Sequence, residues 1–196
     1  MKLKQYHQER SISLSKNEGK QFEEDIQESV KECGEKIFFT RIKDVNIPAP
    51  YRSVVKVAKN DYDCMMFARS HLFTLELKST KEKRVSFSES VIKQHQIDKL
   101  LEASEYENVI SGFLFNFREP DNKVYFVPIQ DFTEYQYIAQ NEIKEHKYVS
   151  KVNKSSIPIG ICNEIGIEIK GFKKRVKWHY HMKEFITEAI GKYAYV

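Results

Sequence analysis

Two apolar segments carry charged residues at positions that could meet across a β-hairpin. They are separated by the four residues 68–71, a suitable length for the connecting loop. Antiparallel pairing that sets Phe67 opposite Leu72 also sets Asp63 opposite Glu76. Because side chains alternate between the two faces of a strand, one face of this hairpin would carry four charged residues: Asp61, Asp63, Glu76 and Lys78.

A facing pair of carboxylates such as Asp63 and Glu76 is unfavourable unless a cation binds between them. Residues opposite each other in a ladder lie about 5 Å apart, and like charges at that distance repel. Mg²⁺ prefers oxygen ligands and binds through few carboxylates together with water and substrate phosphates, so it is the natural counter-ion. Lys78 would then lie beside the ion, where it could orient an attacking water or offset charge that develops on a phosphate.

A non-catalytic interpretation of the same residues stays open. Glu-x-Lys is common on solvated strand edges, and Asp61 opposite Lys78 could be an ordinary surface ion pair. Two features favour the catalytic interpretation. An acid stands at matching depth on the partner strand, and the opposite face of the hairpin is apolar, as expected of a sheet over a core.

Helices and strands are expected around this hairpin. Residues 15–18 form a capping-box pattern that predicts a helix from Ser15 to about Cys33, ended by Gly34. A similar pattern at Ser86 predicts a second helix to about Ala103. Further strands are expected over 37–43, 53–58, 109–117, 123–127, 157–161 and 165–169, with an extended link over 45–52, a helical or irregular stretch over 128–146 and a closing helix over 182–193. This mixture predicts an α/β (α+β) fold with a mixed sheet.

The composition predicts a folded protein of the cytoplasm. Of 196 residues, 41% are hydrophobic and 13% are aromatic, which predicts a single domain over 16–196 after a flexible segment over 1–15. We expect neither a membrane span nor a secretory leader, because no apolar run is long enough. The three cysteines are widely spaced, which argues against a disulfide framework or a cysteine zinc site.

The positive charge gathers near the C-terminus, although the net charge is only +4. Residues 169–183 contain no acidic residue and interleave aromatic residues with basic ones. Such a stretch could grip phosphates and stack on bases, or it could be a solvated basic edge whose aromatic residues face the core. The basic residues that we expect to contact DNA here are Lys170, Lys173, Lys174, Arg175 and Lys177.

The hairpin and its flanks resemble a known nuclease family. An acid followed by Glu-x-Lys at the end of an apolar strand is the pattern of the PD-(D/E)xK superfamily, and the stretch 63–80 is similar to RecU-type Holliday junction resolvases of Gram-positive bacteria and their phages. Residues 19–23 resemble that family's Gly-Lys-x-x-Glu motif. The strand around 39–44 and the post-motif segment with Ser86-Phe87 and 94–97 resemble the family too.

The resemblance implies a restriction-endonuclease-like mixed sheet flanked by helices, and roles for particular residues. Asp63 and Glu76 would be the principal metal ligands, and Glu23 would complete the metal site from the first helix. Lys78 would be the catalytic lysine, and Gln96 would support the site or the substrate. Asp61 is a rival to Asp63, because Asp61-Tyr62 also matches the family's Asp-Tyr dipeptide; spacing and hairpin register favour Asp63. Lys20 and Arg52 would add contacts to DNA.

The resemblance also implies a substrate and a mode of assembly. We expect a Mg²⁺-dependent endodeoxyribonuclease, with Mn²⁺ as a substitute, that resolves four-way junctions in recombination and repair. Because resolution needs two symmetric nicks, a homodimer is expected. Three alternatives stay open: a nuclease of the same fold that acts on duplex DNA, a non-catalytic DNA-binding module, and a structural or phage-assembly protein.

Overall fold

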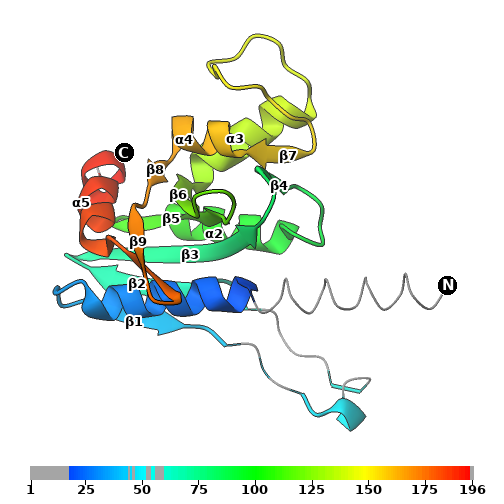
Figure 1. Ribbon diagram of the computed structural model, residues 1–196. Helices are drawn as coiled ribbons and strands as arrows, with labels where there is room; N and C mark the ends of the chain where they lie inside the picture. Colours follow the sequence, from blue (N-terminus) through cyan, green and yellow to red (C-terminus); the bar gives the residue numbers. More distant parts are fainter. Residues whose placement is uncertain (1–17, 44, 46, 52–53, 56–59, 195–196) are drawn as a thin grey trace.

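A six-stranded mixed sheet forms the centre of the structure, a computed structural model that describes residues 18–43, 45, 47–51, 54–55 and 60–194 (Figure 1). Its strands are, in spatial order, β1 (Phe38–Arg41), β2 (Cys64–Ala68), β3 (His71–Thr80), β5 (Val109–Phe117), β6 (Lys123–Pro128) and β8 (Ile167–Glu168). Only the central pair, β3 and β5, is parallel. The predicted mixed sheet is confirmed.

Helices pack on both faces of this sheet. The first helix, described over residues 18–32, lies on one face together with α5 (Met182–Tyr193). The other face packs against α2 (Gln94–Ser104), α3 (Ile129–Gln140) and α4 (Ile159–Ile165). None of the helices in the described ranges is long and apolar enough to cross a bilayer.

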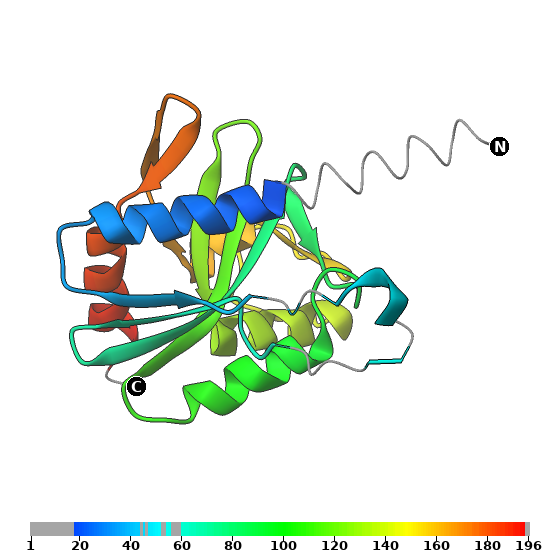
Figure 2. The same ribbon diagram turned by 90° about the horizontal axis from the view of Figure 1, so that it is seen from below.

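Two small two-stranded sheets and one 3₁₀ turn complete the described fold. The short strands β4 (Arg84–Ser86) and β7 (Ser156–Pro158) pair with each other, as do β9 (Gly171–Lys174) and β10 (Lys177–Tyr180). A 3₁₀ turn, η1 (Ala49–Tyr51), lies where the sequence predicted an extended link. The β9–β10 hairpin projects beyond the first helix (Figure 2).

The central strand β5 explains why the sheet is well anchored. Every residue from Ile110 to Phe117 is buried, as expected of a strand covered on both faces. Phe113, Phe115 and Phe117 all face the layer of α2 and α3, where Phe113 stacks 5.2 Å from Phe115. These phenylalanines therefore belong to the core, as the sequence predicted.

The hairpin register is confirmed. Phe67 pairs with Leu72 and Cys64 pairs with Leu75 across an antiparallel ladder. The Asp63 backbone N–H donates to the Leu75 carbonyl at 3.2 Å, which continues the register to the level of the next residue, Glu76. The predicted pairing of Asp63 with Glu76 thus follows from the local alternation of apolar residues.

The second helix begins later than predicted. Ser86 ends β4, residues 89–91 form a turn, and α2 starts only at Gln94. Its first turn is capped by Gln96, whose Oε1 accepts a hydrogen bond from the Lys93 backbone N–H at 3.1 Å. The serines at 86 and 88 hydrogen-bond within the turn instead, which is the competing use of such residues outside helices.

The strand predicted over 157–161 is also wrong beyond its first residues. The strand β7 ends at Pro158, and α4 begins at the next residue. Proline fixes its φ near the helical value and suits the start of a helix, so the alternating isoleucines do not extend the strand. Ile161, Cys162 and Ile165 of α4 are buried against β6 and α3.

Some expectations fall outside the described residues. The helix start at 15–18 lies there except for its last residue, as do the segment 1–15, Arg52 and most of the strand predicted over 53–58. The closing helix is confirmed, and β8 lies within the strand predicted over 165–169. The prediction of one domain over 16–196 stays a prediction.

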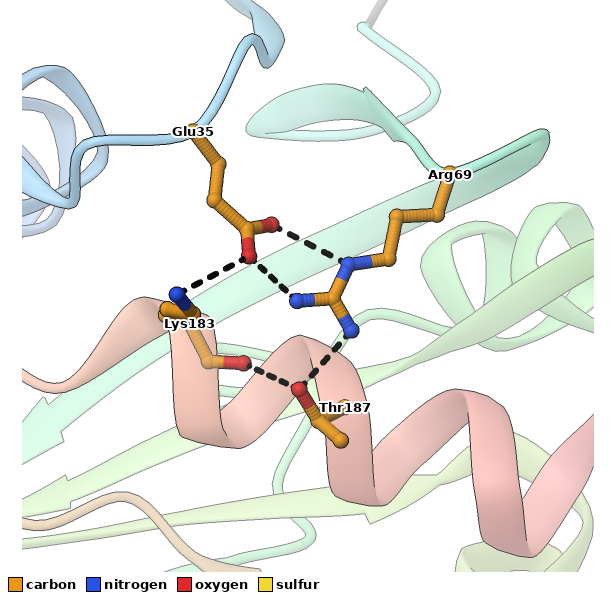
Figure 3. Close-up of polar contacts among 4 residues, drawn as sticks. All are labelled: Glu35, Arg69, Lys183 and Thr187. Atoms are coloured by element: carbon orange, nitrogen blue, oxygen red, sulfur yellow. Dashed lines mark hydrogen bonds and ion pairs between the residues drawn. The ribbon is translucent and has the colours of Figure 1, made fainter.

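Arg69 in the β2–β3 turn joins three elements at one edge of the sheet (Figure 3). Its guanidinium forms two hydrogen bonds to Glu35, which follows the first helix, and a third to Thr187 Oγ1 of α5 at 2.8 Å. Lys183 of α5 lies 3.8 Å from Glu35 Oε1. We call these four residues the Arg69 cluster.

Candidate active site

Several elements end at the edge of the sheet opposite the Arg69 cluster. Because β1 and β3 are both antiparallel to β2, and β3 is parallel to β5, these three strands end at the same edge. The start of the first helix lies there too, since Glu18 forms ion pairs with Lys81 and Arg118 just beyond β3 and β5. Charged residues from distant segments therefore meet at this edge.

Glu76 is the most deeply buried charged residue of the candidate site. It is 2% exposed, and its Oε1 lies 2.9 Å from Lys78 Nζ. Gln96 Nε2 of α2 donates to the same oxygen, and Lys78 Nζ donates to Gln96 Oε1 at 3.2 Å. The three predicted residues thus form a closed triangle of hydrogen bonds.

Asp63 lies next to this triangle. Its Oδ2 accepts a hydrogen bond from the Leu77 backbone N–H at 2.8 Å. Leu77 lies between Glu76 and Lys78 in the sequence, so the Asp63 carboxylate is held next to β3 at the level of these two residues. Asp61 is exposed, whereas Asp63 is half-buried. The geometry therefore brings Asp63, rather than its rival Asp61, to β3.

The surroundings of Glu76 disfavour its ionised form. Burial and, to a smaller extent, the nearby Asp63 raise the pKa of this carboxyl to about 8, although Lys78 acts in the opposite direction. A carboxylate that is removed from water beside a second carboxylate needs more positive charge than one lysine provides. Two such oxygen donors fit a hard divalent cation, which is the ligand chemistry of Mg²⁺.

Glu23 lies close by but has a different partner. It forms an ion pair with Arg41 at the end of β1, 18 residues further along the chain. Glu23, Arg41 and Asp63 line one cavity of about 590 Å³, together with Lys20. Among the described residues no three histidine, cysteine, aspartate or glutamate side chains are placed to hold a metal together, so the metal-binding role of Glu23 stays a prediction.

The basic stretch predicted from the sequence forms the β9–β10 hairpin and its flanks. Lys173 and Lys174 are exposed on β9, and Arg175 lies in the turn with a positive φ of 59°. Lys177 forms an ion pair with Glu28 of the first helix, and Lys170 is exposed before the hairpin. Contacts of these residues with DNA stay predictions.

The aromatic residues of this stretch divide between surface and interior. Tyr180 is 5% exposed and Trp178 packs partly against the core, whereas Phe172 is 52% exposed. His179 is buried, with Nδ1 2.8 Å from Glu32. The interpretation with aromatic residues facing the core therefore holds for Tyr180, whereas the exposed Phe172 fits a stretch that could stack on bases.

Sequence reasoning missed Arg41 as the partner of Glu23 and Arg118 as a partner of Glu18. A strand is predicted around Arg41, but nothing in its local pattern indicates which acidic residue Arg41 would contact. Only the parallel ends of β1, β3 and β5 bring these residues to the first helix. The position of Arg118 directly after the strand predicted over 109–117 is a signal that could have pointed to it.

Comparison with known proteins places these residues in a family context. The family model "RecU: Recombination protein U" matches residues 17–174. The SPbeta prophage-derived uncharacterized protein YotM of Bacillus subtilis (strain 168) is 52% identical over 176 residues, which cover 90% of this chain and 88% of that protein. The matched region contains Glu23, Asp63, Glu76, Lys78 and Gln96.

Among solved structures, the Holliday junction resolvase Hjc of Archaeoglobus fulgidus is similar. The match has a TM-score of 0.47 and 13% sequence identity, and it covers 76% of this chain and 95% of Hjc. The family assignment rests instead on the matches of sequence, which extend over most of the chain. The chain therefore belongs to the Recombination protein U family, the RecU-type Holliday junction resolvases that its motifs resemble.

Proposed function

We propose that this protein is a metal-dependent endonuclease that resolves four-way DNA junctions. The observation that carries the proposal is the contact of Glu76, Lys78 and Gln96 beside Asp63 at the end of β3. These are the residue types that hydrolysis of a phosphodiester needs: oxygen donors for a divalent cation and a lysine next to them. Membership of the family supplies the class of substrate.

In this mechanism Asp63 and Glu76 hold the cation, with Glu23 as a third candidate ligand. When bound, Mg²⁺ or Mn²⁺ would activate water and stabilise the charge that develops on the phosphate. Lys78 Nζ contacts both Glu76 and Gln96, and from this position beside the proposed metal ligands it would orient the nucleophile. Gln96 holds the lysine and the glutamate in one arrangement, which reduces the reorganisation needed during reaction.

Binding of DNA is assigned to the basic surface around this edge. Lys20 lines the same cavity as Asp63. The β9–β10 hairpin, which carries the exposed Lys173 and Lys174, projects beyond the first helix (Figure 2). Phosphate contacts of this kind supply affinity without sequence preference and weaken as salt rises. A homodimer follows from the near two-fold symmetry of a four-way junction, which needs two nicks.

Cleavage of a labelled synthetic four-way junction beside a matched linear duplex tests the proposal. The reactions contain Mg²⁺, Mn²⁺ or a chelator, and the Glu76→Ala protein is assayed in parallel. We expect symmetric, metal-dependent nicking of the junction that is lost in Glu76→Ala. Light scattering of the protein with and without the junction reports whether the dimer forms.

Two other results would redirect the proposal. Cutting of the duplex as readily as the junction would keep the nuclease and exclude junction specificity. Tight, salt-sensitive binding without cutting under either metal would indicate a DNA-binding module of the same fold.

A further inference from the structure

A chain of side-chain hydrogen bonds connects the candidate catalytic strand to the basic hairpin. Ser79, which follows Lys78 in β3, donates to Asn116 Oδ1 of β5 at 2.8 Å. Asn116 Nδ2 donates to Asn122 Oδ1 in the β5–β6 turn at 2.9 Å, and Asn122 Nδ2 donates to the hydroxyl of Tyr180 in β10 at 3.0 Å. We call Ser79, Asn116, Asn122 and Tyr180 the amide network.

Burial makes this network rigid. Asn116 is 2% exposed and Tyr180 is 5% exposed, so an amide or hydroxyl that lost its partner there would not regain a bond from bulk water. Asn122 has a φ of 48°, a left-handed conformation that asparagine tolerates better than most residues. The turn thus presents the Asn122 amide to both neighbours at once.

The base of the β9–β10 hairpin is also tied to the first helix. The Tyr180 backbone N–H donates to Ser29 Oγ of this helix at 2.9 Å. Lys177, which pairs with Lys174 next to the turn, also forms an ion pair with Glu28 of the first helix. Within the described part of the chain Lys173 and Arg175 have no ion pair, and Figure 2 shows the hairpin projecting beyond the helix. The hairpin is therefore fixed to the first helix along β10, while Lys173 and Arg175 remain available to bind a phosphate backbone.

We infer that Asn122 and Tyr180 are positioning residues, which fix the basic hairpin at one distance from β3. DNA whose backbone is gripped by the hairpin tip then presents one particular phosphodiester to Glu76 and Lys78. The inference rests on the proposed nuclease function and adds to it the element that sets the position of the cut. It follows from the chain of hydrogen bonds that runs from Ser79, the neighbour of Lys78, through Asn116 and Asn122 to Tyr180 of β10.

Two substitutions break the network: Tyr180→Phe removes its last hydrogen bond alone, and Asn122→Gly removes this bond together with the one from Asn116. Tyr180→Phe deletes only the hydroxyl, and Asn122→Gly deletes the amide while keeping a residue that accepts positive φ. Matched controls lie elsewhere: Tyr137→Phe changes an exposed tyrosine of α3, and Asn108→Gly changes an exposed asparagine whose φ is 62°.

The position of the cut is the first readout. On an end-labelled junction we expect the wild-type protein and both controls to cut at one main phosphodiester. Tyr180→Phe and Asn122→Gly should cut there about tenfold more slowly and should spread their products over neighbouring phosphodiesters. Their affinity for the junction in chelator should stay within about twofold of wild type, because the phosphate contacts remain.

Trp178 provides a second readout that does not depend on cleavage. It is the only tryptophan of the chain, and it lines a cavity of about 580 Å³ together with Asn116, Asn122 and Tyr180. If the network holds the hairpin, quenching of Trp178 fluorescence by acrylamide should rise in both variants and stay unchanged in both controls. The measurement uses the free protein.

The outcomes separate the inference from the proposed function. A wild-type protein that cuts no junction overturns the proposed function. Unchanged quenching in both variants overturns the inference, as does cutting by both variants at the wild-type position and rate. Loss of junction binding in the variants would also overturn it, because the network would then support grip rather than position.

Discussion

Glu76 and Glu35 both accept hydrogen bonds from a cationic side chain, yet their pKa values shift in opposite directions. The hydrogen bond from Arg69 lowers the pKa of Glu35 at the exposed edge. Burial, together with the smaller effect of Asp63, raises the pKa of Glu76 to about 8, although Lys78 lies 2.9 Å away. A cationic partner alone therefore does not determine the charge of a carboxylate.

This difference favours the edge that carries Glu76, rather than the edge with the Arg69 cluster, as the catalytic one. At the Arg69 cluster, charges of opposite sign meet in water and join three elements (Figure 3). At the candidate site, the fold holds two carboxylates together and removes one of them from water, an arrangement that is unfavourable without a further cation. Substitutions at the two edges should consequently separate activity from stability.

The largest effect is expected from Glu76→Gln and Lys78→Met. Each should reduce junction cleavage by about 10³-fold or more, because each removes a group that the proposed mechanism places at the reacting phosphate. Thermal unfolding checks that both proteins fold. Lys183→Met is the matched control, since this lysine also approaches a glutamate but at the other edge. Residual activity above a tenth of wild type in Glu76→Gln would contradict the assigned role.

Divalent metal should stabilise the protein only through the candidate site. At 100 times its dissociation constant, Mn²⁺ should add about 2.7 kcal/mol to the free energy of unfolding. Asp63→Asn should lose this gain, and Glu35→Gln should keep it, because Glu35 lies at the opposite edge. Thermal unfolding with increasing Mn²⁺ measures both. An equal gain in Asp63→Asn would place the ion elsewhere.

A smaller loss is expected from Gln96→Ala. The substitution releases Glu76 and Lys78 from a shared partner, which should lower the cleavage rate about tenfold without removing a ligand. Gln94→Ala is the control in the same helical turn, since Gln94 is exposed and its side chain donates to Asp98. Equal rates for the two variants would show that the Gln96 contacts are not needed.

The smallest effect is expected from Arg69→Ala. It removes exposed contacts to Glu35 and Thr187, so the midpoint of thermal unfolding should fall slightly. Cleavage and Mn²⁺ stabilisation should be unchanged. Calorimetry and the junction assay test this together, with Lys151→Ala as an exposed control. A large fall in cleavage would contradict this prediction and show that the Arg69 cluster affects the candidate site at the opposite edge.

The hairpin was predictable because its determinants are local. Apolar alternation and a short loop fix the register of β2 and β3, and this register brings Asp63 to the level of Glu76. The start of α2 was not predictable in the same way. Serines near residue 86 suit a cap, but their pairing with β7 excludes a helix there, and the pairing involves a segment about 70 residues away.

The amino-acid sequence by itself determined the mixed sheet, the register of the candidate catalytic hairpin and the family. These depend on periodicity and on motifs within short stretches. Only the tertiary structure decided how deeply Glu76 is buried, that Arg41 pairs with Glu23, and that Asn122 reaches Tyr180. Burial and long-range pairing depend on how all layers pack together, so no local pattern encodes them.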